Sequence, residues 1–67
     1  MFEYQFTVPM KRELLNPQIK RFVNSQEVYY EYIETKDGFS YSLEFSTDIK
    51  VNNFKRELNE RFPNIYL

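Results

Sequence analysis

The chain contains no cysteine, no histidine and no tryptophan among its 67 residues. Without cysteine the fold cannot depend on disulfides, and without cysteine and histidine the usual zinc sites are excluded. Without these two residues, proton transfer or nucleophilic attack would have to rely on lysine, glutamate, aspartate or tyrosine, so we expect no enzymatic activity. The sequence holds no calcium-binding loop either, and we expect neither a metal nor a cofactor.

Long apolar runs are also missing from the chain. No stretch approaches the length that spans a bilayer, and the alternating N-terminal residues lack the basic start of a signal peptide. These features, together with the absence of cysteine, lead us to expect a cytoplasmic protein without membrane contact. The formal net charge of −1 gives no overall attraction to nucleic acid or to anionic lipid.

The chain is rich in aromatic residues, with six tyrosines and seven phenylalanines. A chain of 67 residues is near the lower size limit for a self-sufficient core. Because disulfides and zinc are excluded, stability must come from packing or from self-association. Aromatic side chains bury large apolar areas. We therefore predict a single small domain over residues 1–67, and we expect a homodimer to be one way of burying more surface.

Alternation of apolar and polar residues predicts three strands. The first runs over residues 2–8 and is ended by Pro9, which cannot donate to a sheet ladder. The second runs over residues 27–35 and the third over residues 39–46. In the third strand the alternation is unbroken, so one of its faces is predicted to lie in the core.

The turn between the second and third strands decides which residues face the core. Asp37 and Gly38 predict a two-residue hairpin loop, which would place Tyr30 opposite Phe45. A three-residue loop would instead bring Glu31 onto the apolar face, because a slip of one residue exchanges the two faces. Burying an unpaired carboxylate is costly, so the sequence favours the two-residue loop.

Two helices are predicted on either side of the hairpin. Asn16 is a good N-cap and Pro17 is favoured at the first helical position, which indicates a helix over residues 17–25. Thr47 or Asp48 opens the second helix, which ends before a proline. Its apolar residues at helical spacing are Ile49, Val51, Phe54, Leu58 and Phe62. The stretch before Asn16 is open between a helical turn and a loop.

The predicted order of elements is β-α-β-β-α. A right-handed crossover makes the first two strands parallel and places the first helix on one face of the sheet. The second helix packs on the same face, because each strand has one apolar side. We therefore predict an α+β fold, a two-layer sandwich in which two helices cover one face of a three-stranded sheet. The residues expected in its core are Phe6, Tyr30, Leu43, Phe45, Phe54 and Leu58.

The uncovered face of this sheet is predicted to be acidic, with carboxylates, serines and two apolar side chains but no lysine or arginine. A solvated surface is the simplest interpretation, since antiparallel sheets commonly expose one face. In the functional interpretation, the apolar residues anchor a protein partner and the carboxylates steer it by its basic surface. A nucleic-acid-binding protein would present such a surface. The predicted partner-binding residues are Glu3, Glu27, Tyr29, Glu31, Ile33 and Glu44.

Basic residues gather instead in the helical parts of the sequence. The alternative set, which could contact phosphate groups, is Lys11, Arg12, Lys20, Arg21, Lys55 and Arg56. Glutamates at positions 13, 57 and 60 interrupt it, so a mixed solvated surface is the simpler interpretation. If this set were functional, the chain would be a small dimeric nucleic-acid-binding regulator.

The sequence thus favours a non-enzymatic protein-interaction module that regulates or inhibits a larger partner, with direct nucleic-acid binding as the alternative. Small cysteine-free domains of this kind resemble, in type, the accessory proteins of phages and mobile elements. The apolar C-terminal residues Ile65, Tyr66 and Leu67 either fold back onto the domain or are available for contacts.

Overall fold

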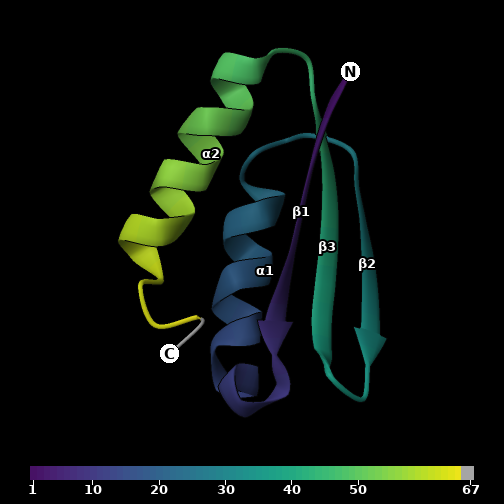
Figure 1. The fold of residues 1–67 in the computed structure, drawn as a ribbon, viewed down its shortest axis with the longest axis vertical. Coiled ribbons are helices and arrows are strands. Elements are labelled where there is room, and N and C mark those ends of the chain that lie inside the picture. Colours follow the sequence, from purple (N-terminus) through teal and green to yellow (C-terminus); the bar gives the residue numbers. More distant parts are fainter. Residues whose placement is uncertain (66–67) are drawn as a thin grey trace.

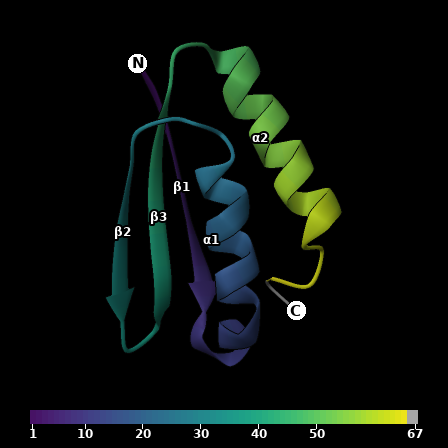
Figure 2. The same cartoon turned by 180° about the vertical axis from the view of Figure 1, so that it is seen from behind.

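The computed structural model describes residues 1–65 and contains three strands, two α-helices and a 3-10 helix. The elements are β1 (Phe2–Pro9), η1 (Met10–Leu15), α1 (Asn16–Asn24), β2 (Tyr30–Thr35), β3 (Gly38–Phe45) and α2 (Asp48–Arg61). Figures 1 and 2 show this order from opposite sides. The predicted α+β class and the β-α-β-β-α order are confirmed, and the ambiguous stretch before α1 is the 3-10 helix.

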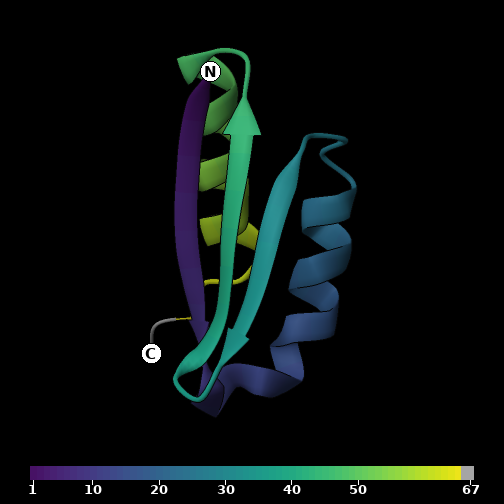
Figure 3. The same ribbon diagram turned by 90° about the vertical axis from the view of Figure 1, so that its right-hand side faces the viewer.

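The sheet has the strand order β1-β3-β2, and β3 is antiparallel to both of its neighbours. The first two strands are therefore parallel, as predicted, but β3 lies between them. Viewed from the side, both helices lie behind or beside the strands, and the other face of the sheet is uncovered (Figure 3). We call this uncovered side the open face.

The core lies between the sheet and the helices and is largely aromatic. Phe22 of α1 stacks on Phe54 of α2 with 5.2 Å between ring centroids, and Phe54 also lies 5.4 Å from Phe45 of β3. Of the core residues predicted from sequence, those that are buried are Phe6, Leu43, Phe45, Phe54 and Leu58. Tyr30 is half-buried, because its hydroxyl reaches out to donate a 2.6 Å hydrogen bond to Asn24.

The predicted hairpin register is wrong by two residues. Tyr30 pairs with Leu43 rather than Phe45, and the two-residue loop is formed by residues 36 and 37, with Thr35 opposite Gly38. A slip of two keeps every side chain on its face, so the predicted faces hold. The cause is in β1: a Cβ on Gly38 would lie 2.2 Å from the Val8 carbonyl oxygen, so the glycine is needed inside the strand.

Thr47 is the N-cap of α2, and its side chain accepts a 3.2 Å hydrogen bond from the Lys50 backbone N–H. The expectation that Ile49 belongs to the apolar stripe is wrong, because its side chain is 66% exposed. Ile49 precedes Phe54 by five residues and so lies about 140° away from it around the helix axis. It points away from the core.

The N-cap role predicted for Asn16 is also wrong. Asn16 is the first residue of α1, and no side chain caps this helix. Its amide is buried and bonds to tyrosines of the sheet instead. At the other end of the chain, Ile65 folds back and is buried. Tyr66 and Leu67 lie outside the described residues.

Candidate functional site

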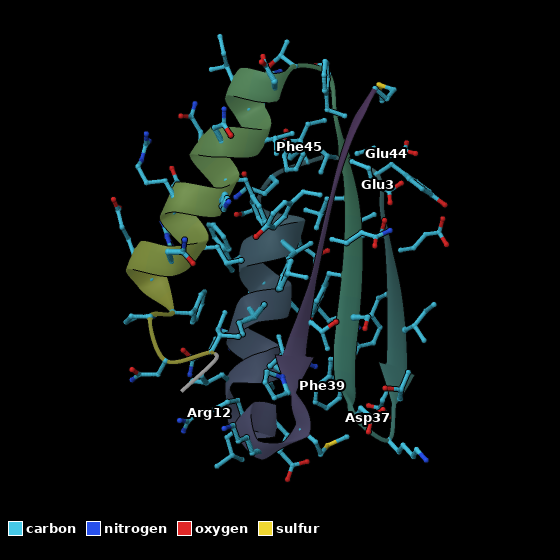
Figure 4. The ribbon with its side chains drawn as sticks, viewed as in Figure 1. Glu3, Arg12, Asp37, Phe39, Glu44 and Phe45 are labelled. Carbon is cyan, nitrogen blue, oxygen red and sulfur yellow. The ribbon has the colours of Figure 1, made fainter. Side chains whose placement is uncertain are left out.

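The open face brings the acidic residues of β1 and β3 together. Glu3 and Glu44 are direct register partners on adjacent strands. In Figure 4 both side chains point away from the helices, whereas Phe45 points toward them. Glu31 of β2 faces the same way and pairs with Ser42 of β3. Three of the predicted carboxylates therefore share one surface.

The pairing of Glu3 with Glu44 is electrostatically unfavourable. Side chains directly opposite each other on antiparallel strands approach within about 5 Å at Cβ, and like charges there are destabilising. The Gln5 amide donates a hydrogen bond to the Glu3 carboxylate, which satisfies one oxygen but does not neutralise it. None of the strand residues on the open face is basic. This surface consequently carries uncompensated negative charge.

A shallow hollow of about 380 Å³ lies in the middle of the open face. Glu3 and Glu31 line it on two sides, and Ile33 of β2 supplies an apolar wall. Across its base the hydroxyls of Thr7 and Ser40 are hydrogen-bonded at 3.0 Å. The hollow offers oxygen acceptors next to an apolar side chain, which suits a long basic side chain with an aliphatic stem.

Tyr29 and Ile33, the predicted anchors, are both exposed on this face, at 63% and 58%. Tyr29 precedes β2 but continues its pairing, because its carbonyl accepts a 3.0 Å hydrogen bond from the Glu44 N–H. Its hydroxyl donates to Glu31 at 3.4 Å. The negative charge of Glu31, and to a smaller extent that of Glu44, raises the pKa of the Tyr29 hydroxyl above 10.0.

The expectation that Glu27 shares the open face is wrong. The strand predicted to begin there begins at Tyr30. Glu27 instead sits in the turn after α1 with φ of 55°, and its N–H donates to the Asn24 carbonyl at 3.2 Å. The left-handed backbone turns the chain, and Glu27 lines a hollow beside Lys50 and Glu57 of α2. It lies apart from the other predicted partner-binding residues.

The six basic residues of the alternative set all lie outside the sheet. They are divided among η1, which holds Lys11 and the half-buried Arg12, and the two helices α1 and α2. The Lys20 ammonium lies 4.2 Å above the Tyr32 ring. Arg56 pairs with Glu60 along α2, 3.9 Å apart and exposed.

One basic pair was missed by the sequence analysis. Arg21 of α1 and Arg61 of α2 line a common hollow between the helices. The guanidinium of Arg61 lies over the Phe22 ring, with its central carbon 5.0 Å from the ring centroid. The only sequence signal for this arrangement is that both arginines belong to the last turn of a helix.

Within residues 1–65, no three acidic side chains gather closely enough to hold a metal ion. In the same part of the chain, neither helix is long and apolar enough to cross a membrane. Compared with known proteins, the chain matches no family model, no curated protein and no solved structure.

Proposed function

We propose that this protein is a non-enzymatic binding module that docks its open face on a basic surface of a larger protein and thereby regulates or inhibits it. The observation that carries the proposal is the Glu3–Glu44 pair: two carboxylates directly opposite each other, with no basic side chain on the face. The exposed anchors Tyr29 and Ile33 lie on the same surface.

The charge on the open face lowers the stability of the isolated protein. Opposed like charges on neighbouring strands lower stability by several tenths of a kcal/mol or more. A basic partner removes this repulsion and adds attraction of its own, so the same charges that weaken the free domain favour the complex. Lysine or arginine side chains entering the central hollow would meet Glu3, Glu31 and the aliphatic surface of Ile33.

Charges and anchors are expected to act at different stages of binding. Complementary charge steers encounter and raises association rates by about tenfold to a thousandfold, an effect that salt weakens. Buried apolar and aromatic contacts mainly set the dissociation rate. Glu31 and Glu44 should therefore control association, whereas Tyr29 and Ile33 should control the lifetime of the complex.

Nucleic-acid binding through the six predicted basic residues is the weaker proposal. Those residues are spread over three elements, and Arg56 already has a carboxylate partner. The aromatic rings of β3 face the helices and are buried, so they offer no platform on which bases could stack.

The test is affinity capture from a lysate, with and without nuclease treatment, using three forms of the protein. The sheet variant carries Glu31→Lys and Glu44→Lys. The control variant carries Glu13→Lys and Glu60→Lys, which change the net charge equally but lie on η1 and α2. Circular dichroism verifies that all three are folded.

We expect a protein captured by the wild type to be retained by the control variant and lost by the sheet variant, with capture weakening as salt rises. For that protein, Tyr29→Ala should accelerate dissociation with little change in association. If the sheet variant captured the same protein as well as the wild type, the open face would not be the binding surface. Capture abolished by nuclease would favour the nucleic-acid alternative.

A further inference from the structure

The C-terminal turns of α1 and α2 face each other across an open hollow of about 440 Å³ on the helical side of the molecule. Its lining is Gln18, Arg21, Phe22, Ser25, Arg61 and Phe62, and none of these residues is acidic. We propose that this hollow is a binding site for a phosphate dianion, such as inorganic phosphate or a phosphomonoester. The site is separate from the open face and does not depend on the function proposed for it.

The Arg61 side chain lies against the aromatic ring of Phe22. Its guanidinium carbon lies 5.0 Å from the centroid of the Phe22 ring. Phe22 is buried and stacks on Phe54 at 5.2 Å, so the ring under the guanidinium is part of the core. A guanidinium over one aromatic ring still has N–H groups that do not touch the ring, and two such groups on one edge match two oxygens of a phosphate.

Arg21 supplies a second guanidinium from the other helix. Either arginine alone is explained by its favourable interaction with the partial negative charge at its own helix C-terminus. That interaction does not require the two side chains to line the same hollow, where their positive charges repel. A dianion between them would remove the repulsion, which is the argument for a doubly charged ligand over a singly charged one.

Neutral groups complete the hollow. The Ser25 hydroxyl donates to the Phe22 carbonyl at 2.6 Å and lies within 3.3 Å of the Gln26 amide, so it is already engaged in the structure of the turn. The amide of Gln18 supplies further donors at the rim. Both arginines are exposed and the helix C-terminal carbonyls oppose an anion, so binding should be weak but specific in geometry.

The test is an NMR titration of isotope-labelled protein with sodium phosphate at pH 7.5, with ionic strength held constant by chloride. We expect saturable shifts of the Arg21 and Arg61 side-chain N–H signals. Arg21→Gln and Arg61→Gln should each weaken binding at least fivefold. The matched control Arg56→Gln also removes one charge from α2 but lies outside the hollow, and it should leave the affinity within twofold.

Titrations with two other ligands test whether the site prefers a phosphate dianion. Dimethyl phosphate, a monoanion that imitates the nucleic-acid backbone, should bind at least fivefold more weakly than phosphate. A single-stranded oligonucleotide without terminal phosphates should shift these two signals no more than dimethyl phosphate does. If the oligonucleotide bound more tightly and depended on both arginines, the site would be a backbone site and the dianion proposal would be wrong.

Shifts that fail to saturate, or that are equal in the Arg56→Gln and Arg61→Gln variants, would also overturn the proposal. Because Arg61 covers part of the core, Arg61→Lys provides a variant that keeps the charge and the stem but loses the planar fork. It should bind phosphate more weakly than the wild type while its amide spectrum stays that of the folded domain.

Discussion

Asn16 and Tyr41 form a buried hydrogen bond that joins α1 to the central strand of the sheet. The Tyr41 hydroxyl donates to Asn16 Oδ1 at 2.6 Å, and Asn16 Nδ2 donates in turn to the Tyr32 hydroxyl at 3.0 Å. Asn16 is the one polar residue among the buried side chains of residues 1–65. A buried amide is tolerated because its oxygen and nitrogen both have partners.

Removing the Tyr41 hydroxyl should therefore lower the stability of the fold substantially. In Tyr41→Phe the Asn16 carbonyl oxygen stays buried without a donor, and we expect a loss of about 1 to 3 kcal/mol in the free energy of unfolding. Tyr30→Phe removes a hydroxyl bonded at the same 2.6 Å but near solvent, and it should cost less. Urea denaturation of both variants provides the comparison. Equal losses would show that burial of Asn16 adds nothing to the strength of this bond.

Alkaline pH should destabilise the fold because it ionises Tyr41 in the unfolded chain. Burial, and then the neighbouring Tyr32 and Tyr30, raise the pKa of Tyr41 well above 10.0. The folded state thus keeps a phenolic proton that the unfolded chain releases near pH 10, so this contribution to stability is intact below pH 10 and falls above it. The fall is up to about 1.4 kcal/mol per pH unit. The slope of unfolding free energy between pH 10 and 11 should be smaller in Tyr41→Phe.

Gly38 should tolerate no side chain. Its φ of +153° is rare for residues with a Cβ, and that atom would lie 2.2 Å from the Val8 carbonyl oxygen. Because the obstacle is backbone of a paired strand, Gly38→Ala should destabilise the domain by more than about 2 kcal/mol, in the range of the most damaging single substitutions. The neighbouring Lys36→Ala, in the exposed loop, should shift the melting temperature little. A stable Gly38→Ala protein would contradict the close approach of β1.

The charge on the open face should reduce stability. Glu44→Gln relieves the repulsion from Glu3 and should raise the free energy of unfolding by about 0.2 to 1 kcal/mol. Glu60→Gln also removes one negative charge but breaks the exposed pair with Arg56, so it should be neutral or slightly destabilising. Denaturation at low and high salt measures both, and the benefit of Glu44→Gln should shrink with salt. A destabilised Glu44→Gln would remove the electrostatic basis of the proposed function.

Glu27 occupies a backbone conformation that favours glycine. With φ of 55°, a residue with a Cβ is disfavoured by about 1 to 2 kcal/mol relative to glycine. Glu27→Gly should therefore be more stable than Glu27→Ala, whereas in an extended strand alanine would be the better residue. Thermal unfolding of the two variants decides between the observed turn and the strand that the sequence predicted.

The sequence was sufficient to predict which face of each strand lies in the core. It was insufficient to predict the contacts between elements that are far apart in the chain. Alternation along β3 identifies Phe39, Tyr41, Leu43 and Phe45 as core residues without any knowledge of the partner strands. The hairpin register is different, because it depends on how closely Gly38 approaches β1, and local turn preferences do not contain that information. For the same reason, Asn16 reads as a helix cap until a tyrosine from β3 meets it.

For the candidate surfaces too, the sequence predicted the positions of some residues and not of others. Glu3 and Glu44 could be placed on one face from period alone, because a strand alternates strictly. The face of Glu31 followed from the predicted two-residue loop and from the cost of burying a carboxylate. Glu27 was misplaced because nothing in its neighbours signals a left-handed residue. The meeting of Arg21 with Arg61 depends on how the two helices pack, which no local pattern encodes.

The central position of β3 has a consequence for the newly made chain. Within residues 1–65, strand β1 pairs only with β3, with Phe2 opposite Phe45, so it has no strand to pair with until β3 has been synthesised. The β2–β3 hairpin closes over a two-residue loop and needs no distant segment, so it can form first. Until then residues 2–9 form an alternating aromatic segment with free backbone groups, the kind of segment that chaperones shield from aggregation.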